Sequence, residues 1–550
     1  MSHNSNKASA SLESLLRIFT VPETPESTLG ILDQLISKNL SGFLQQHIVA
    51  EELDLAEIEK DFTETRISEA PLFVSEQTQF LLDKVVSQSV HTASPHFVGH
   101  MTSALPYFMI PLSKIMIALN QNLVKTETSK AFTPLERQVL GMLHRLVYDE
   151  AEGFYGHWLH DAHQHLGAFC SGGTVANITA LWAARNRAFA AEGTFGGIGE
   201  EGVYAAFKHY QCEGAAVLVS ERGHYSLSKA ADVLGIGRQG LVAVETDGRN
   251  RIRPQALESK LAELRAKGIR PFGLVGIAGT TETGHIDPLA TLADIAAEQQ
   301  LHFHVDAAWG GPTLFSERYR GRLQGIERAD SVTLDAHKQL YVPMGAGLVV
   351  FKDPATLSSI EQHAQYIIRK GSKDLGSHSL EGSRPGMAML VHSALQIIGR
   401  RGYELLIDQG IEKAAAFAEM IQADSQFELI TEPELNILTY RWRPRAAQRL
   451  LAAGASEARL QLNELLNRST RYIQKTQREQ GRAFVSRTSL TPESYQGQAI
   501  VVFRVVLANP LTTLAVLADI LEEQRQIATD PALADCIGAI EQRVVAAVSG

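Results

Sequence analysis

Short apolar runs alternate with helical patterns between residues 166 and 351, and this alternation restricts the possible folds more than any other feature of the chain. The runs expected to be strands are residues 166–170, 215–220, 272–278, 301–308, 331–334 and 345–351. The helical patterns between them are residues 174–191, 226–234 and 289–299. Strands that alternate with helices predict an α/β fold, with a mostly parallel sheet covered by helices on both faces. Ligands of such sheets bind at the carboxyl ends of the strands.

The 550 residues are more than one hydrophobic core usually serves, so several structural units are expected. Residues 1–115 read as a polar start followed by amphipathic helices, for example 31–40 and 48–62. Such helices cannot bury their apolar faces alone, so we expect them to pack on the main body or on a second subunit. Residues 116–395 are predicted to form the large domain. Residues 396–550 are predicted to form a smaller α+β domain.

The formal charge of −10 argues against a nucleic acid or an anionic membrane as partner. The cysteines Cys170, Cys212 and Cys536 lie far apart in the sequence, which favours a reducing compartment without structural disulfides. The polar start has no signal-peptide core, and no apolar run approaches the length of a membrane span. A cytoplasmic protein is therefore expected.

Two of the predicted strands end in residues suited to pyridoxal phosphate chemistry. The run 331–334 leads to Lys338, and lysine is the residue that forms a Schiff base with this cofactor. The run 301–308 carries Asp306, whose carboxylate could pair with the pyridine nitrogen, while the small Ala308 lets a flat ring lie close. His337 could hold the phosphate or the Schiff base. The ordinary alternatives are a solvated surface lysine and an aspartate in a helix cap or a structural salt bridge.

Two further segments follow strands in the same way. Residues 171–174, Ser-Gly-Gly-Thr, precede a helix, where glycines allow a phosphate to approach the free N–H groups of a helix N-terminus. The alternative is an ordinary strand-to-helix turn with Thr174 as cap. His224 follows the run 215–220 and could stack on the cofactor ring and transfer protons, although a surface histidine in a turn is an equally ordinary interpretation.

Four histidines occur between residues 153 and 167: His157, His160, His163 and His165. Their spacing matches no standard structural-zinc pattern, so a polar loop at the edge of the site is favoured over a metal cluster, and no metal is assigned.

Taken in order, these motifs resemble those of the group II PLP-dependent amino-acid decarboxylases. The matching segments are SGGT at 171–174 with Asn177, HYS at 224–226, AGTTETG at 278–284, HVDAAWGG at 304–311 and DAHK at 335–338. The resemblance covers residues 95–520 and implies the aspartate-aminotransferase fold, PLP fold type I, in a homodimer with its sites at the subunit interface. It further implies the following roles: Gly173 and Thr174 hold the phosphate, His224 stacks on the ring, Asp306 pairs with the pyridine nitrogen, Lys338 is the Schiff-base lysine, and Thr281 borders the cofactor.

Other segments narrow the resemblance. The run 503–510 looks like a segment of glutamate decarboxylases in which an arginine, here Arg504, grips the α-carboxylate of the substrate; the alternative is a surface ion pair. Residues 95–102 and 125–128 look most like the bacterial aspartate 1-decarboxylases, which make β-alanine for pantothenate synthesis. His100 falls where glutamate decarboxylases contact the side-chain carboxylate, so it is the candidate for substrate selection.

The resemblance implies decarboxylation of L-aspartate to β-alanine. L-Glutamate, giving 4-aminobutyrate, is the alternative substrate, and cysteine sulfinate is also open. An aminotransferase on the same fold and a non-enzymatic binding protein are the alternatives from other functional classes. Animal glutamate decarboxylases carry a tyrosine in a mobile loop that reprotonates the substrate carbon, whereas residues 370–381 contain no tyrosine. His378 is the proton donor expected in its place.

Overall fold

The computed structural model describes residues 28–45, 49–50, 53–364, 371–445, 447–448 and 456–549. Its largest element is a seven-stranded sheet in the order β1-β7-β6-β5-β4-β2-β3. The strands are β1 Gly167–Cys170, β2 Gly214–Ser220, β3 Leu241–Val244, β4 Ile269–Ile277, β5 His302–Asp306, β6 Ser331–Asp335 and β7 Gly347–Phe351. The five strands from β6 to β3 pair in parallel, and only β7 runs antiparallel to its neighbours β1 and β6. This confirms the predicted mostly parallel sheet.

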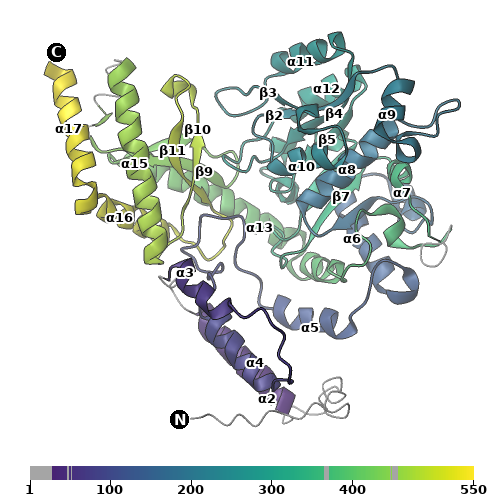
Figure 1. Ribbon diagram of the computed structural model, residues 1–550, viewed down its shortest axis with the longest axis horizontal. Coiled ribbons are helices and arrows are strands. Elements are labelled where there is room, and N and C mark those ends of the chain that lie inside the picture. The colour runs from purple at the N-terminus through teal and green to yellow at the C-terminus, as the bar shows by residue number, and fades with distance from the viewer. Residues whose placement is uncertain are drawn as a thin grey trace.

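Helices cover both faces of this sheet because successive strand residues point to opposite sides. In β2, Leu218 packs in the core on one face, whereas Val217 and Val219 pack in the core on the other. The first core also contains residues of α6 Phe132–Tyr148, α11 Pro254–Ala266 and α12 Leu289–Gln299. The second contains residues of α8 Gly173–Ala188, α9 Ile198–His209 and α10 Tyr225–Val233. Figure 1 shows this layered domain on the right, with α8 and α10 beside the sheet.

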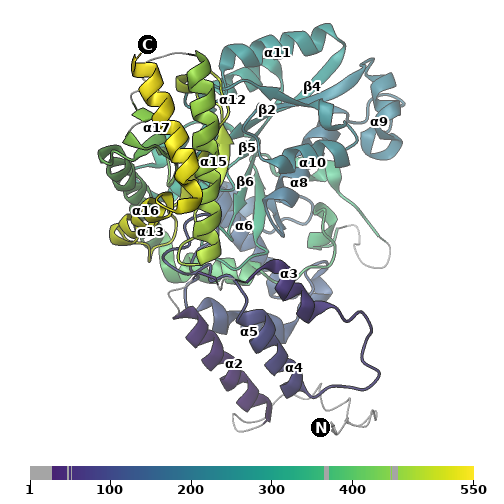
Figure 2. The same ribbon diagram turned by 60° about the vertical axis from the view of Figure 1, so that its left-hand side comes forward.

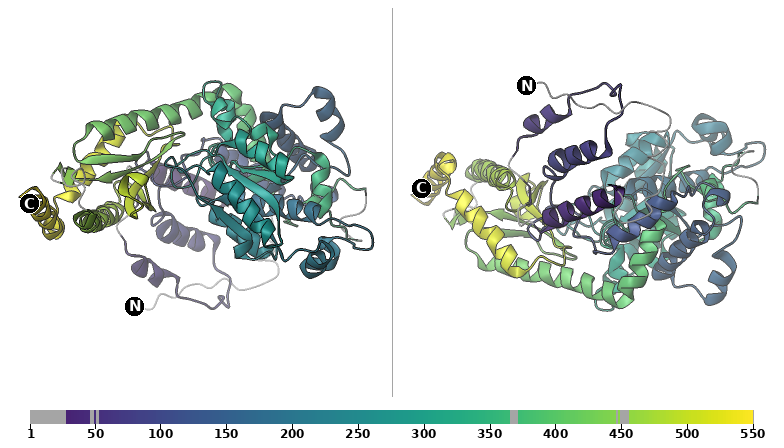
Figure 3. Two further views of the ribbon diagram at one scale, coloured as in Figure 1. Left: turned by 90° about the horizontal axis from the view of Figure 1, so that it is seen from above. Right: turned by 90° about the horizontal axis from the view of Figure 1, so that it is seen from below.

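A smaller antiparallel sheet in the order β10-β11-β9-β8 has a hydrophobic core of its own, at the left of Figure 1. Its strands are β8 Phe427–Thr431, β9 Ile437–Trp442, β10 Ser486–Leu490 and β11 Ile500–Val506, and its helices are α15 Ser456–Gln480, α16 Leu514–Ala528 and α17 Ala534–Ser549. The element α13 Ala388–Ala423, bent at Gly399, contributes first to the large core and then to this one. The two views of Figure 3 show it running between the two sheets.

The amino-terminal helices lie apart from both sheets, as Figure 2 shows below the main body. They are α2 Thr28–Leu44, α3 Leu55–Ile58, η2 Glu59–Phe62, α4 Val74–Phe80, the π-helical η3 Leu81–Val86 and α5 Met109–Leu119. The expectation of one helix over residues 48–62 is wrong for its described part before α3. Val49 donates its N–H to the carbonyl of Gly481 and accepts from the N–H of His91, so its backbone is bound to other segments rather than to a helix. Residues 48, 51 and 52 lie outside the described ranges.

Shorter helical elements complete the described chain. They are α7 Glu152–Trp158, η4 Thr126–Thr128, η5 Arg238–Gly240, η6 Gly311–Phe315, η7 Arg320–Leu323, η8 Ile326–Arg328, η9 Pro354–Ile360, η10 Leu375–His378, η11 Glu493–Tyr495 and η12 Pro531–Leu533. Within the described ranges, no helix combines the length and apolar character that crossing a membrane requires.

Candidate active site

A cavity of about 370 Å³ opens where β4, β5 and β6 end, and it brings together all eight residues predicted to contact a cofactor. These are Gly173, Thr174, His224, Thr281, Asp306, Ala308, His337 and Lys338. Residues separated by up to 165 positions in the sequence therefore meet in one place. A larger cavity, of about 650 Å³, lies between α6 and η7 and contains none of these eight.

Lys338 follows β6 within a tight turn, and its amine faces a carboxylate that sequence analysis assigned no role. Its Nζ lies 3.0 Å from Oδ2 of Asp335, a buried residue that ends β6. The other oxygen of Asp335, Oδ1, is buried and makes no hydrogen bond to any residue that the structure describes. A Cβ at Gly173 would lie 2.7 Å from Oδ2, so only glycine fits beside this carboxylate. His337 donates from Nδ1 to the carbonyl of Ala346 at 2.9 Å, which turns its Nε2 toward Asp335 at 3.7 Å.

Asp306 is the last residue of β5 and is 7% exposed, at the cavity wall. Its Oδ2 accepts from the side-chain amide of Asn177 at 2.9 Å, and its Oδ1 accepts from the N–H of Ala308 at 3.2 Å. A carboxylate offers about four acceptor positions, so two are left for a group in the cavity. A protonated pyridine nitrogen is a donor of the required kind.

His224 caps the start of α10 with its Nδ1, which accepts from the N–H of Ser226 at 3.3 Å. Burial lowers the pKa of His224, and the nearby carboxylate of Asp306 opposes that shift. The ring is therefore a neutral imidazole near neutral pH, and its remaining proton sits on Nε2. A neutral, flat ring at the cavity wall suits stacking on a pyridine ring.

The turn before α8 lies at the cavity wall and has the features of an anion site. Gly173 and Thr174 begin this 16-residue helix, so their free N–H groups stand at the positive end of its dipole, at the cavity wall. Arg222 also lines the cavity, and its Nε is buried without a hydrogen-bond partner in the described part of the chain. Sequence analysis missed Arg222, although its position two residues before His224 was a usable signal. An amine, a carboxylate, an imidazole and a helix N-terminus around one cavity fit pyridoxal phosphate.

Arg504 comes from the small domain and contacts two segments at the cavity's edge. Its Nε donates to the carbonyl of Thr281 at 2.7 Å, and its Nη1 donates to the carbonyl of Gly99 at 3.2 Å. Among the described residues, none forms a hydrogen bond with its Nη2, which leaves that nitrogen for a ligand. Burial lowers the pKa of Arg504 to about 10, and the carboxylate of Glu282 opposes the shift, so the guanidinium stays charged at neutral pH.

His100 lies next to Met101, a residue of the cavity wall. The N–H of Thr102 donates to Nδ1 of His100 at 3.3 Å, so the neutral ring carries its proton on Nε2. Burial, followed by the positive charges of Arg504 and Lys338, lowers the pKa of His100. His100 can therefore offer one N–H to a carboxylate in a region of positive potential.

The segment carrying His100 is bound to the small domain. Val98 donates its N–H to the carbonyl of Phe484 at 3.0 Å and accepts from the N–H of Val506 at 2.7 Å. Phe97 stacks on Phe484, with the ring centroids 5.0 Å apart. His100 and Arg504 are thus held by the same small sheet.

His378 does not line the cavity that contains Lys338. Its ring is buried and stacks on His165, with the centroids 4.0 Å apart, and its Nδ1 lies 2.6 Å from Oγ of Ser377. Burial, followed by the positive charge of Arg137, lowers the pKa of His378 to about 4, so this ring is neutral. Lys370, the first residue of the expected loop, lies outside the described ranges.

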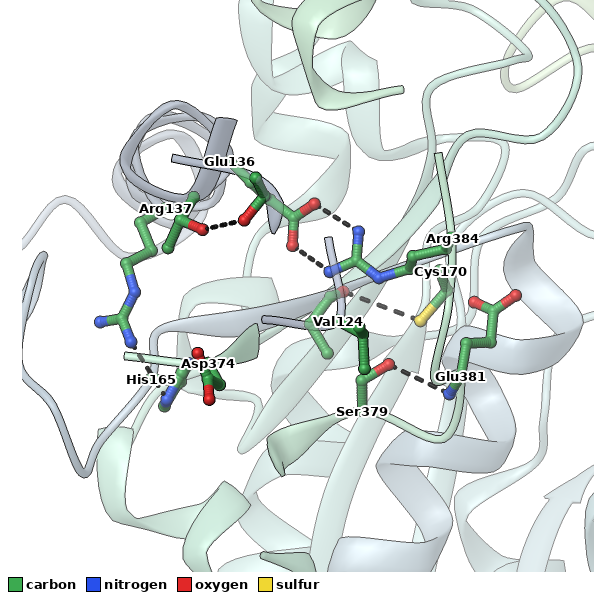
Figure 4. Close-up of polar contacts among 12 residues, drawn as sticks. Val124, Glu136, Arg137, His165, Cys170, Asp374, Ser379, Glu381 and Arg384 are labelled. Carbon is green, nitrogen blue, oxygen red and sulfur yellow. Dashed lines mark hydrogen bonds and ion pairs between the residues drawn. The ribbon is translucent and has the colours of Figure 1, made fainter. Parts of the chain in front are cut away.

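The segment that contains His378 is held by several polar contacts, and Figure 4 shows the ion pair between Arg384 and Glu136. Asp374 accepts from the N–H of Thr126 at 2.8 Å, and Gly376 donates its N–H to the carbonyl of Val124 at 3.0 Å. Arg384 forms a buried two-pronged ion pair with Glu136 of α6. These contacts fasten residues 371–384 to residues 122–137, and the carboxylate of Glu381 reaches Ser171 N–H at 2.9 Å beside the cavity.

Comparisons with known proteins match this chain to decarboxylases. The family model described as the pyridoxal-dependent decarboxylase conserved domain matches residues 64–443. An aspartate 1-decarboxylase from Aliivibrio fischeri is 64% identical over 522 residues, which cover 95% of each chain. An acidic amino acid decarboxylase from Bos taurus is 29% identical over 66% of this chain and 67% of its own. The crystal structure of mouse CSAD in apo form shares the fold, with a TM-score of 0.78 and 24% identity over 91% of this chain and 98% of that one.

Proposed function

This chain belongs to the pyridoxal-dependent decarboxylase family, and from that premise we propose that it removes the α-carboxylate of L-aspartate as CO2, leaving β-alanine. The observation that carries the proposal is the meeting of Lys338 and Asp306 in one cavity, with Arg504 hydrogen-bonded to Thr281 of the cavity wall. Aspartate is favoured as substrate because the Aliivibrio fischeri relative, 64% identical along nearly the whole chain, is named an aspartate 1-decarboxylase. The product would supply pantothenate synthesis.

Pyridoxal phosphate, when bound, supplies an aldehyde that captures the substrate's amino group and a ring that takes up the electron pair left by CO2. Lys338 would anchor it covalently, with Asp335 accepting the ammonium whenever the amine is released. Asp306 would hold the proton on the pyridine nitrogen. Arg504 would hold the α-carboxylate so that its bond to Cα stands perpendicular to the ring. Nε2–H of His100 would donate to the side-chain carboxylate of the substrate.

The test is CO2 release from L-aspartate, L-glutamate and cysteine sulfinate by the PLP-loaded protein, with the amine products identified. Fastest release from aspartate, with β-alanine formed, is the expected result, and a His100→Ala variant should reduce the preference for aspartate. A preference for glutamate would keep the reaction and overturn the proposed substrate. A keto acid formed together with pyridoxamine phosphate would overturn the reaction in favour of transamination.

Arg504→Lys is expected to raise KM for the amino acid by about 10- to 100-fold, because a hydrogen-bonded ion pair to a carboxylate is lost. Lysine keeps the positive charge but cannot donate to Thr281 and Gly99 while also gripping a ligand. Steady-state kinetics would measure the change. Arg487→Lys, at an exposed arginine on the adjacent strand β10, is the matched control and should leave KM unchanged. An unchanged KM in Arg504→Lys would contradict the assigned role.

A homodimer is the proposed working unit, because the amino-terminal helices expose a large apolar surface. Its members on α2, α4, η3 and α5 are Ile31, Leu35, Val74, Phe80, Leu81, Val85, Ile110, Ile115, Ile117 and Leu119. Exposed apolar surface of this extent marks an interaction site in proteins. A second copy of the chain would cover it through the same helices.

Replacement of both Ile115 and Ile117 by aspartate is expected to weaken the dimer by at least about 100-fold, since each buried carboxylate would lack a partner. Analytical ultracentrifugation over a concentration series would measure this. Leu405→Asp, at a comparably exposed apolar residue on α13, is the control and should leave the dimer intact. A double variant that dimerises like the unmodified protein would place the interface elsewhere.

His378 is still proposed as the donor of the proton to Cα, but with a condition set by its position. Since it does not line the cavity of its own chain, residues 371–381 would have to serve the cavity of the second subunit. Coexpressed His378→Ala and Lys338→Ala chains would then regain part of the activity in mixed dimers. Full turnover by His378→Ala alone would rule out the role.

We also propose a cytoplasmic location. Cys170, Cys212 and Cys536 form no disulfide, and Cys170 and Cys536 are buried, in keeping with a reducing compartment.

A further inference from the structure

The side chain of Asn177 in α8 is linked to two residues proposed to contact the cofactor. It bonds to Asp306 directly and to His224 through Ser226. It is 1% exposed, and its amide has three partners. Its Nδ2 lies 2.9 Å from Oδ2 of Asp306 and 3.1 Å from Oγ of Ser226, while its Oδ1 lies 3.1 Å from Nε2 of His304. All three partners belong to elements that end at the cavity, so this one amide connects β5 with α10.

Donors and acceptors in this network can be assigned from chemistry alone, beginning at Asp306. A carboxylate only accepts, so the nitrogen of Asn177 must face Asp306 and its oxygen must face His304. His304 therefore carries its proton on Nε2, and its Nδ1 accepts from the hydroxyl of Ser331 at 2.8 Å. With that hydroxyl proton committed, Ser331 accepts from Nε2 of His302, also at 2.8 Å. In the chain that runs from His302 through Ser331, His304 and Asn177 to Asp306, every donor therefore points in the direction of Asp306.

Burial keeps both histidines in the form that this arrangement needs. It lowers the pKa of His304 to about 4, against the opposing carboxylate of Asp306, and the pKa of His302 to about 3. A neutral imidazole has one N–H and one acceptor, so each ring can pass the direction of hydrogen bonding onward. Aligned hydrogen bonds polarise one another, and here the positive end of the chain meets the carboxylate.

The second branch runs from Asn177 to His224. Ser226 accepts from Nδ2 of Asn177, so its own hydroxyl proton is free to go to Nδ1 of His224, 2.9 Å away. That nitrogen also accepts from the N–H of Ser226. The two donors together keep the proton of the His224 ring on Nε2. Rotation of the Asn177 amide by half a turn would oppose oxygen to the Asp306 carboxylate and break both branches.

We propose that Asn177 is a positioning residue that fixes the anionic, acceptor state of Asp306 and the Nε2–H tautomer of His224 together. The inference rests on the proposed roles of Asp306 and His224 toward pyridoxal phosphate. One amide would thereby fix the hydrogen-bonding state of Asp306, at the edge of the pyridine ring, and of His224, which stacks on its face. Both groups share Asn177 as a support, Asp306 through a direct hydrogen bond and His224 through the hydroxyl of Ser226.

The test is the dissociation constant of pyridoxal phosphate, measured by titrating the cofactor into protein freed of it and following the visible absorption band. Asn177→Ala is expected to raise this constant about 10- to 100-fold, the loss of one hydrogen bond to a charged group. Asn177→Asp, which keeps the shape but replaces the donor with an acceptor, should raise it further. Asn186→Ala makes the same change on the same helix, where the side chain bonds only to groups away from the cavity, and should leave the constant unchanged.

Variants of single branches sharpen the result. His304→Leu should weaken cofactor binding in the same direction as Asn177→Ala, and His304→Gln, which can still donate to Asn177, should restore most of the affinity. Ser226→Ala interrupts only the His224 branch and should change the constant less than about threefold, because Asp306 keeps its donor.

A cofactor affinity in Asn177→Ala or Asn177→Asp equal to that of the unmodified protein would overturn the inference, as would equal losses in Asn177→Ala and Asn186→Ala. Asp306→Asn separates this failure from that of the proposed site. If Asp306→Asn weakens cofactor binding and Asn177→Ala does not, only the role of Asn177 is wrong. If Asp306→Asn also binds normally, the proposed role of Asp306 fails with it.

Discussion

Replacement of Lys338 by alanine is expected to stop CO2 release, with a fall in turnover of about 10³- to 10⁶-fold, the range seen when a covalent catalytic group is removed. Lys338, which follows β6 and lines the cavity, is the residue proposed to anchor pyridoxal phosphate covalently. Its loss also leaves the carboxylate of Asp335 buried without a countercharge, so the melting temperature should fall. Assays of CO2 release would measure the fall in turnover, and calorimetry would measure the fall in melting temperature.

Lys338→Arg separates the two effects. Arginine keeps a positive charge beside Asp335 but forms no Schiff base, so the melting temperature should largely recover while turnover stays lost. Borohydride reduction followed by peptide mass spectrometry should find the cofactor attached to Lys338 in the unmodified protein and to neither variant. Attachment to another lysine would disprove the assignment.

Removal of the negative charge at Asp306 is the second large effect. Asp306→Asn is expected to lower turnover about 10²- to 10³-fold, the scale of losing a preorganised electrostatic contact in a closed site. The asparagine keeps an oxygen for the Asn177 amide but no longer holds a proton on the pyridine nitrogen. Without that proton, bound pyridoxal phosphate would supply a weaker electron sink for the pair left on the substrate carbon. Single-turnover CO2 release would isolate this step from cofactor loss.

Asp330→Asn is the matched control, since Asp330 also lies beside the large sheet and accepts a backbone N–H, that of Phe303, at 2.7 Å, but is not part of the cavity wall. It should lower stability without changing the single-turnover rate. Equal rates for Asp306→Asn and the unmodified protein would show that the pyridine nitrogen finds its partner elsewhere.

Much of the large domain was predictable, because its strands are short apolar runs bounded by helical patterns. The meeting of Asp306 and Lys338 in one cavity was predictable for a related reason: both lie at the carboxyl ends of neighbouring strands, and the ends of parallel strands share one edge. The strand β3, Leu241–Val244, was missed. The helical pattern at residues 48–62 misled because backbone contacts to distant segments outweigh local propensity at Val49.

Residues that act through distant partners could not be assigned a role from the sequence. Asn177 meets Asp306 across 129 positions, and asparagine within a helix has no spacing that indicates such a contact. Asp335 pairs with the amine of Lys338 because a turn brings the two side chains together, and a three-residue spacing alone does not predict that turn. His378 had the right chemistry, but its place beside His165 depends on how two long segments fold together.

The binding of residues 97–99 to the small domain has a consequence for how substrate length is measured. His100 and Arg504, proposed for the two carboxylates of the substrate, are both fixed to the sheet of β9, β10 and β11, whereas Lys338 and Asp306 are fixed to the large sheet. The separation between the two carboxylate contacts is therefore set largely by contacts within the small domain, although Arg504 also bonds to Thr281 of the large domain. Movement of one domain against the other would change the distance from the substrate's amino group to the cofactor. The separation between His100 and Arg504 would change less. Altering the accepted chain length would then require changes within the small domain and residues 97–102, not at the cofactor.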